Sequence, residues 1–340
     1  MLQSYEVAIR LVSFAAIFAA IALWEAAAPR RVRSFARARR WPSNLGVVAL
    51  NNGLVRVLLP LTAVSLAMVG ARRGWGLLHN LAVPFPVAVV ASVILLDLTI
   101  YLQHVMLHAV PVFWRMHRVH HADLDFDATT GVRFHPFEIA LSMLIKLAAV
   151  VALGAPALGV LVFEILLNAT SMFNHGNIRL PLRLDRYLRW FTVTPDMHRV
   201  HHSILVDETN SNFGFNLSWW DRLLGTYRAQ PAAGHERMTI GIEQFRDARE
   251  LWLDRMLLQP FRGSVGEYPI ARTEVAAFIE PAELKRRLET REAVTLVDAR
   301  SADEFDGPLG HIRGARNIPL SELAEKATQF RERGRSAVAV

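Results

Sequence analysis

The chain has 340 residues and contains no cysteine. This absence excludes disulfides, thiolate-bound zinc and iron–sulfur clusters, so histidine and carboxylate side chains are the residues left to hold a metal ion. Charged residues are also few, at 20% of the chain, and the mean hydropathy is +0.23. Because the apolar residues occur in long uninterrupted stretches, the composition indicates a membrane protein and not a soluble one.

Histidine, in contrast, is concentrated in a repeated motif. The hexapeptide Met-His-Arg-Val-His-His occurs at residues 116–121 (the first hexapeptide) and again at residues 197–202 (the second hexapeptide). The two copies contain six of the thirteen histidines. Residues three and four apart share one face of a helix, so each copy can direct three imidazoles into one space. His104 and His108 form a further pair at helical spacing just upstream.

This pattern predicts a metal centre. Neutral imidazole is a common ligand of zinc, iron, copper and nickel, and eight imidazoles exceed what one ion needs, so we expect two metal ions. A lone buried histidine is more often a hydrogen-bonded core residue, but that interpretation does not account for the same triplet occurring twice. The predicted ligands are His104, His108, His117, His120, His121, His198, His201 and His202.

Four apolar stretches predict the membrane-embedded part of the fold. We expect spans at about 5–28, 45–69 and 83–108, and a hairpin at 139–174 that turns at Gly154-Ala155-Pro156. The predicted fold class is an all-α integral membrane helical bundle with a cytosolic histidine-rich helical cap. Together they form one domain over residues 1–260.

An arginine-rich segment sets the expected orientation. Six arginines lie within residues 30–40, directly after the first predicted span. By the positive-inside rule this segment is cytoplasmic, and we interpret it as a topology signal and not as a nucleic-acid site. Both hexapeptides and the C-terminus then face the cytoplasm, and the protein is expected to be a multi-pass protein of a bacterial inner membrane.

Asp97 is an ionisable residue inside the third predicted span. Such groups are costly at membrane depth and are usually functional or paired. Asp97 precedes His104 by two helical turns, so it could accept a hydrogen bond that orients this imidazole. A plain hydrogen bond between helices is an equally open alternative.

The three histidine clusters resemble the histidine boxes of the fatty acid hydroxylase and sterol desaturase superfamily. The resemblance covers about residues 83–227 and includes the flanking segments 133–138, 174–177, 194–198, 208–216 and 220–227. It implies a di-iron enzyme that hydroxylates or desaturates a lipid, such as a sterol-like or fatty acyl substrate. Such an enzyme would use two iron ions, O2 as co-substrate and two electrons from a separate donor, a ferredoxin or a cytochrome or reductase.

The resemblance also implies a ninth metal ligand, His175, which lies between the second and third boxes. His135 lies in a stretch typical of the family, but a structural hydrogen bond explains it at least as well as metal ligation. His79, His235 and His311 match no box, and we expect them to be ordinary surface or loop residues.

Two other functions remain open from the residues alone. A membrane zinc hydrolase would need a general-base carboxylate near the ligands, for which Asp123 and Asp196 are the nearby candidates. A metal transporter or sensor would place histidines along a path between the two membrane faces. The clustering of the histidines at one face argues against this second alternative.

The last part of the chain has a different character. Residues 261–272 are expected to be a linker, and residues 273–340 resemble part of a rhodanese-like α/β domain. We predict helices at 283–290 and 320–333 and a strand at 294–297, with a further strand from Ala337. The cysteine that rhodanese-like enzymes normally use is absent, so this segment is not expected to transfer sulfur. We expect a truncated product, with a degenerate docking module as the alternative.

Overall fold

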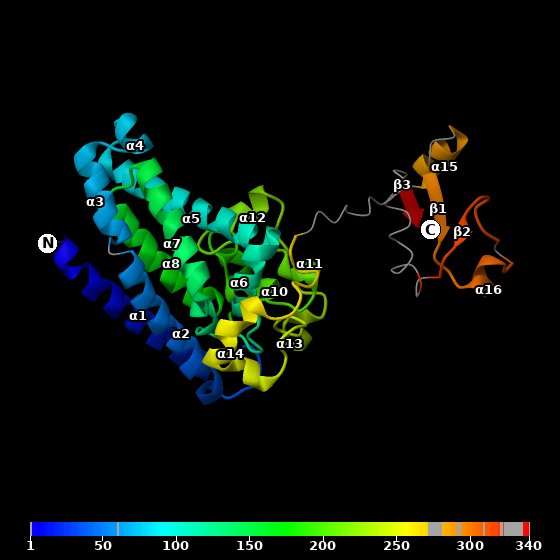
Figure 1. Ribbon diagram of the computed structural model, residues 1–340, viewed down its shortest axis with the longest axis horizontal. Coiled ribbons are helices and arrows are strands. Elements are labelled where there is room, and N and C mark those ends of the chain that lie inside the picture. Colours follow the sequence, from blue (N-terminus) through cyan, green and yellow to red (C-terminus); the bar gives the residue numbers. More distant parts are fainter. Residues whose placement is uncertain are drawn as a thin grey trace. The chain divides into compact units, whose positions relative to one another are not determined.

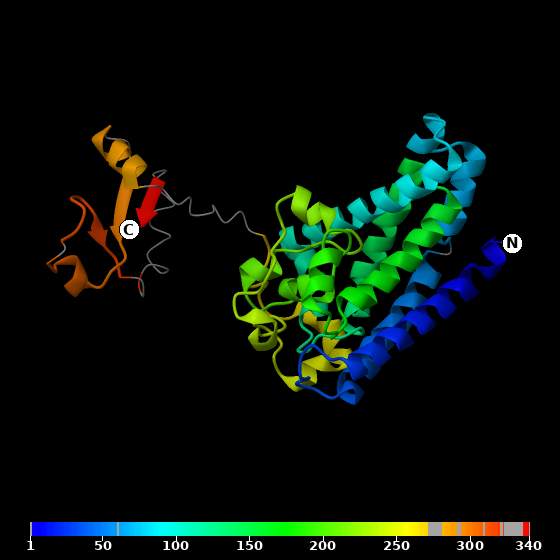
Figure 2. The same cartoon turned by 180° about the vertical axis from the view of Figure 1, so that it is seen from behind.

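The structure is a computed structural model that describes residues 2–59, 61–270, 281–290, 294–308, 310–319, 322 and 336–339. The chain divides into two compact units, residues 1–271 and residues 272–340. The first unit is a bundle of long helices with most of the shorter helices gathered at one end and α3 and α4 at the other, as Figures 1 and 2 show from opposite sides. The shorter helices gathered at the first end form the cap.

The long helices account for the apolar stretches. Among the described residues, five segments are long and apolar enough to cross a membrane: Tyr5–Ala27, Arg37–Asn80, Phe85–Ala109, Pro136–Leu153 and Ala157–Asn174. The helices of this part are α1 (Leu2–Ala27), α2 (Arg37–Leu58), α3 (Ala63–Arg73), α4 (Leu77–Asn80), α5 (Phe85–Ala109), α7 (Pro136–Leu153) and α8 (Ala157–Asn174). The spans expected at 5–28 and 83–108 correspond to α1 and α5.

The span expected at 45–69 falls within the candidate span Arg37–Asn80, in which α2 ends at Leu58 and α3 begins at Ala63. The sequence has Pro60 between them, and proline disfavours a continuous helix by removing a backbone donor and restricting the preceding residue. The side chain of Thr62 then starts α3 by accepting a hydrogen bond from the backbone N–H of Ser65 at 3.1 Å.

The hairpin between α7 and α8 turns at the predicted glycine. Gly154 ends α7 with φ of 66°, a left-handed conformation that favours glycine. A Cβ atom at Gly154 would also collide with the backbone of Trp75, which follows α3. α8 lies against α1, α3 and α5, so its side chains form much of the core, with Val160 and Phe163 fully buried.

The cap consists of short helices that connect the long ones. They are α6 (Pro111–His121), η1 (Thr130–Val132), α9 (Leu182–Leu188), α10 (Pro195–His201), α11 (Val206–Thr209), α12 (Trp219–Leu223), α13 (Gly234–Arg237), η2 (Ala248–Leu251), α14 (Leu253–Leu258) and η3 (Gln259–Phe261).

Residues 261–270 belong to the helical unit, although the sequence predicted a linker from 261. The ring of Tyr268 stacks on Trp114 with 5.4 Å between centroids. The backbone N–H of Ile270 donates to the carbonyl of His108 at 2.8 Å. The glycines that suggested a linker lie instead in a segment that is hydrogen-bonded to Trp114 and Arg118 of α6.

The second unit is a small α/β arrangement. Strand β1 (Val294–Asp298) pairs in parallel with β2 (Arg316–Asn317) and β3 (Ser336–Ala339), in the order β2-β1-β3. In register, Val294 is opposite Ser336 and Val297 is opposite Arg316. Helices α15 (Pro281–Glu289) and α16 (Ala302–Phe305) complete the described part. The helix expected at 320–333 lies outside the described residues apart from Glu322.

Candidate metal centre

All nine histidines predicted as ligands come together where the cap meets the ends of α5 and α8, and all are buried. They form two groups, and the nitrogens that could bind a metal lie within 4.8 Å of one another in each. The five-histidine group is His104, His108, His117, His121 and His201. The four-histidine group is His120, His175, His198 and His202.

The first hexapeptide meets the end of α5 because the chain reverses between them. α5 stops at Ala109, and α6 begins at Pro111, whose fixed φ suits the first position of a helix. The reversal brings Nε2 of His117 to 3.0 Å from Nε2 of His104, and Nε2 of His121 to 3.2 Å from Nε2 of His108.

His175 occupies the centre of the four-histidine group. It caps the C-terminal end of α8, and its Nε2 atom lies 3.1 Å from the Nε2 atoms of His120, His198 and His202. His198 and His202 come from the second hexapeptide: His198 lies in α10, and His202 directly follows this helix. α10 begins at a proline and is capped by Thr194, whose side chain accepts from the N–H of Met197.

Backbone carbonyls fix the proton positions of several imidazoles. The Nδ1 atoms of His104, His175 and His201 lie 2.8, 2.7 and 2.7 Å from the carbonyl oxygens of Phe213, Ser171 and Ser211. Because a carbonyl only accepts, each Nδ1 carries the proton and each Nε2 is left with a lone pair. In this arrangement the lone pairs point inward.

Side chains orient two further imidazoles. His117 Nδ1 lies 2.7 Å from Oε1 of Glu138, and His108 Nδ1 lies 3.0 Å from Oδ1 of Asn210. Carboxylate and amide partners of this kind hold metal-binding histidines in one tautomer. The Nε2 atoms of His104 and His117 then face each other with no proton between them, an arrangement that a cation would stabilise.

The electrostatics favour neutral imidazoles. Burial lowers the pKa of His117 and of His175 to about 3. Burial and the neighbouring histidines lower the pKa values of His198 and His202 well below the ordinary value as well. Since the neutral form is the one that binds metals, the residues fit a metal centre without having to lose a proton at pH 7. Nε2 of His201 is buried without a hydrogen-bond partner, which also fits a role as a ligand.

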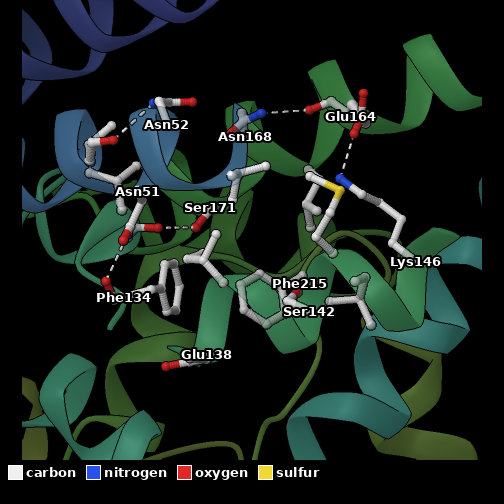
Figure 3. Close-up of a pocket in the computed structure, with 18 of the residues that line it drawn as sticks. Asn51, Asn52, Phe134, Glu138, Ser142, Lys146, Glu164, Asn168, Ser171 and Phe215 are labelled. Carbon is white, nitrogen blue, oxygen red and sulfur yellow. Dashed lines mark hydrogen bonds and ion pairs between the residues drawn. The ribbon is translucent and has the colours of Figure 1, made fainter. Parts of the chain in front are cut away.

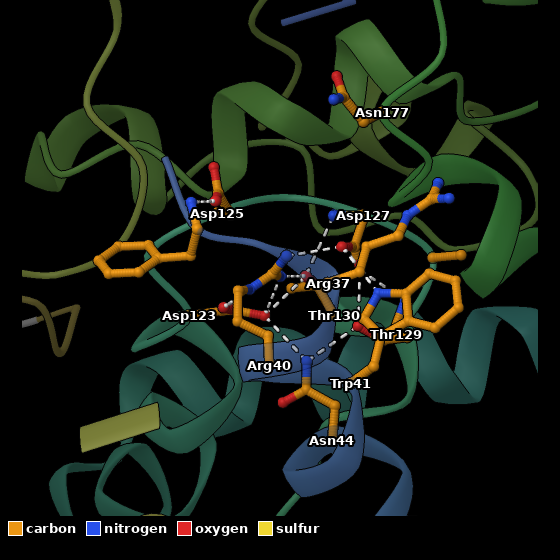
Figure 4. A network of polar contacts seen from close by, with 12 residues as sticks. Arg37, Arg40, Trp41, Asn44, Asp123, Asp125, Asp127, Thr129, Thr130 and Asn177 are labelled. Atoms are coloured by element: carbon orange, nitrogen blue, oxygen red, sulfur yellow. Dashed lines mark hydrogen bonds and ion pairs between the residues drawn. The ribbon is translucent and has the colours of Figure 1, made fainter. Parts of the chain in front are cut away.

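A buried polar network braces the segment after the first hexapeptide. Arg40 of α2 donates to Asp123 at 2.8 and 2.6 Å and to Asp127 at 2.6 Å, and Asn44 donates to Asp123 and Thr129. Figure 4 shows these side chains converging between α2 and the 123–130 segment. Burial alone would raise the pKa of Asp123, but the charges of Arg40 and Arg133 bring that pKa far below its usual range. Asp123 is therefore committed to ion pairs and is not free to act as a base.

Asp97 does not contact His104, so the suggestion that it orients this imidazole is wrong. Its carboxylate accepts from the backbone N–H groups of Asn216 and Leu217 and from Nε1 of Trp220, at 2.9 to 3.3 Å. The open alternative, a hydrogen bond between elements, is what the structure shows. The carboxylate that does orient a candidate ligand is Glu138, which ends the segment 133–138 noted in the sequence.

The remaining histidines lie outside both groups. His135 precedes α7 and its Nδ1 accepts from the N–H of Phe137 at 3.2 Å, so it has the structural role considered for it. His79 is exposed on α4, and the exposed His311 stacks on Phe305. The expectation for His235 is wrong, because this residue is buried, with Nε2 3.7 Å from Oδ2 of Asp196.

A cavity opens beside the five-histidine group. It has a volume of about 410 Å³ and lies between α1, α2, α5, α7 and α8. His104, His117 and Glu138 line one end, and Lys146 and Glu164 line another part of it. The cavity therefore connects the predicted metal ligands with the interior of the candidate spans.

The fold and site together define an integral membrane helical protein with a buried centre of histidines suited to metal binding. Residues 89–226 match the fatty acid hydroxylase family, and residues 280–340 match the rhodanese-like domain. The chain thus carries a fatty acid hydroxylase domain followed by a rhodanese-like domain, as the histidine boxes and the C-terminal motifs indicated.

Three curated proteins illustrate the similarity. An ornithine lipid hydroxylase, OlsE, of Rhizobium tropici is 29% identical over 151 residues, which are 44% of this chain and 44% of that protein. Cholesterol 25-hydroxylase of Rattus norvegicus is 27% identical over 48% of this chain and 53% of that protein. Alkylglycerol monooxygenase of Xenopus tropicalis is 26% identical over 38% of this chain and 28% of that protein. The matches thus span about half or less of these relatives, and no solved structure matches the chain.

Proposed function

We propose that this protein is a membrane-bound di-iron oxygenase that hydroxylates or desaturates a lipid, with O2 as co-substrate and two electrons from a separate donor. The observation that carries the proposal is the convergence of nine buried histidines in two groups, one of which lies beside a cavity between apolar helices. The relatives support hydroxylation, since their names describe two hydroxylases and a monooxygenase.

Each histidine group would hold one iron ion. When bound, an iron pair activates O2 for attack on an unactivated C–H bond. The chain's own residues supply the fixed geometry: Glu138 and the carbonyls of Phe213 and Ser211 hold three imidazoles with their Nε2 atoms inward. Several metals accept histidine ligands, so iron is proposed from the family and not from the donor set.

The cap would face the cytoplasm, where a soluble electron donor could reach it. The arginine-rich segment 30–40 contacts the cap directly, with Arg30 3.2 Å from Asp196 and Arg31 donating to the carbonyl of His235 at 2.8 Å. If these arginines are cytoplasmic, the cap in contact with them, and the histidine centre with it, lies on the cytoplasmic side as well. Some of the arginines also have structural partners, so they serve packing as well as topology.

Elemental analysis of the purified, freshly prepared protein tests the proposal. We expect about two irons per chain, as a dinuclear centre requires, and a loss of iron in His120→Ala and His201→Ala, which each remove one ligand from a different group. His79→Ala is the matched control, since His79 is exposed and lies in neither group. In vesicles, the ligand variants should insert but no longer oxidise lipid.

Three results would contradict the proposal. Protein that contains zinc and no iron, when iron was supplied during expression, would favour the hydrolase. Protein without any metal would leave the histidine groups without the proposed role. Lipid oxidation retained by His120→Ala would show that the centre is not required for the reaction.

A further inference from the structure

Most of the lining of the cavity beside the five-histidine group is apolar, but charged side chains also reach it. Its lining includes the charged side chains of Arg10, Lys146 and Glu164, in addition to Glu138 at the histidine end. Along α7, Glu138 and Lys146 are eight residues apart, which corresponds to about 12 Å of helix. The apolar residues suit an acyl chain, whereas the charged side chains require a polar partner.

The charges form a cluster of both signs around the buried carboxylate of Glu164. Nζ of Lys146 lies 2.5 Å from Oε1 of Glu164, and Nη1 of Arg10 lies 3.1 Å from Oε2 of the same carboxylate. Figure 3 shows Lys146 reaching across the cavity from α7 to Glu164 on α8. Ionisable groups inside membrane spans are costly and are usually paired or functional. Here Lys146 has one partner for its three N–H donors among the described residues, so it can also bind a further anion.

Unpaired oxygens line the part of the cavity nearer the histidines. Oδ1 of Asn51, Oε1 of Gln103 and Oε2 of Glu138 are buried without a hydrogen-bond partner among the described residues. The orientation of the Asn51 amide is fixed, because its Nδ2 donates to the carbonyl of Phe134 at 2.9 Å. Buried acceptors without donors indicate a ligand that supplies N–H or O–H groups.

We propose that this cavity binds the zwitterionic headgroup of a membrane lipid, with its acidic group toward Lys146 and Arg10 and its ammonium group toward the unpaired oxygens and carboxylates. This inference rests on the proposed function and names the substrate class for it. The volume of about 410 Å³ is at the lower end of ligand sites. It therefore accommodates a headgroup and its nearest carbons, which places the polar part of the lipid next to His104 and His117.

Lipid binding to the purified full-length protein in nanodiscs tests this inference. The probes are an N-acylated diamino acid with free ammonium and carboxylate groups, phosphatidylethanolamine, a free fatty acid of the same chain length and a sterol. We expect the two zwitterionic probes to bind more tightly than the fatty acid and the sterol. A difference between the two zwitterionic probes would tell a carboxylate-bearing headgroup from a phosphate-bearing one.

Variants connect this selectivity to the charged cluster. Lys146→Met should weaken binding of the preferred zwitterionic lipid by about tenfold or more, as the loss of a charged hydrogen bond predicts. Lys146→Met/Glu164→Gln removes both charges and avoids a buried unpaired carboxylate if the single variant folds poorly. Leu144→Ala is the matched control, because Leu144 is exposed on the same helix and does not line the cavity.

The outcomes separate this inference from the proposed function. Equal binding of the sterol and the zwitterionic lipids, or unchanged binding in both Lys146 variants, would overturn the headgroup site. Metal content measured on the same preparations reports on the histidine centre independently. Selective lipid binding by protein without iron would retain the headgroup site and contradict the oxygenase.

Discussion

The two hexapeptides have the same sequence but divide their histidines in opposite ways. The first gives His117 and His121 to the five-histidine group and His120 to the four-histidine group. The second gives His201 to the five-histidine group and keeps His198 and His202 in the other. The repeat therefore does not form two separate sites, because each group requires ligands from both copies.

The arginine within each copy shows how different surroundings use one sequence. Arg118 donates to the carbonyls of Ser264, Gln259 and Arg262, and so ties the 259–264 segment to α6. Arg199 instead pairs with Asp196 and donates to the carbonyl of Gly176, beside His175. The hexapeptide fixes the spacing of the imidazoles, and its neighbours decide which group each imidazole joins.

Removing the last histidine of each copy should give the largest effects. His121→Ala takes a ligand from the five-histidine group, and His202→Ala takes one from the four-histidine group. We expect each variant to lose iron mainly from its own group, to retain about one iron per chain and to lose lipid oxidation. Iron content with Mössbauer spectroscopy measures this. Loss of the same iron signal in both variants would show that the groups are not the two metal sites.

Replacing the arginines should separate their roles. Arg118→Ala leaves three carbonyls, one of them buried, without their donor, a destabilisation of about 1 to 3 kcal/mol. We expect faster hydrogen exchange at residues 259–268 and a lower melting temperature. Arg199→Ala should leave exchange in that segment unchanged, since its contacts lie elsewhere. Equal exchange in both variants would contradict the assignment of Arg118 to this segment.

Glu138 holds His117 of the first hexapeptide by a hydrogen bond. Among the described residues, no carboxylate contacts an imidazole of the second hexapeptide. Glu138→Ala should lower the metal affinity of the five-histidine group by about ten- to a hundredfold, the usual effect of losing such a partner. Glu138→Gln retains an acceptor for His117 and should lose less. Competition with a chelator measures both, and an unchanged affinity in Glu138→Ala would exclude the supporting role.

A smaller, pH-dependent effect is expected at Asp221, which holds the loop whose carbonyls orient His104 and His201. Asp221 accepts from the N–H groups of Phe213 and Gly214 at 2.7 and 3.0 Å, and burial raises its pKa to about 6. Between pH 3.8 and 6 the folded state binds more protons than the unfolded state, so this group's contribution to stability falls as pH rises through that window.

Asp221→Asn should remove this contribution, on the order of 3 kcal/mol across the window. Thermal melting from pH 4 to pH 7 would then depend less on pH in the variant than in the native protein. Asn216→Asp, on the same loop, is a comparison that adds a carboxylate without removing Asp221. Parallel pH profiles for the native protein and Asp221→Asn would show that Asp221 does not titrate in this range.

The sequence predicted which nine histidines come together, but not which residues hold their imidazoles by hydrogen bonds. The ligand spacing is local, since it depends only on helical periodicity within short segments. The partners are distant in the chain: His108 and Asn210 are 102 residues apart, and His117 and Glu138 are 21 apart. Only the tertiary fold brings such pairs together. Asp97 shows the same limit, since its closeness to His104 along α5 suggested a contact that the fold does not make.

Segment boundaries were predictable where one residue determines them. Gly154 ends α7 because its left-handed backbone suits glycine, and this turn was expected. Hydropathy indicated a span over 45–69 but not its division into α2 and α3, although the sequence has Pro60 in that stretch. The 261–270 segment was misjudged because its glycines indicated a flexible connection, while its attachment to α6 depends on Trp114 and Arg118, more than 140 residues earlier.

The position of the histidines on the helices has a mechanical consequence. His104 and His108 lie near the end of α5, and His175 caps α8, so two candidate spans end directly in predicted ligands. A helix tilts when its apolar length exceeds the thickness of the hydrocarbon layer around it. We therefore expect the spacing between the two histidine groups, and with it the redox behaviour of any bound metals, to depend on the thickness of the surrounding bilayer.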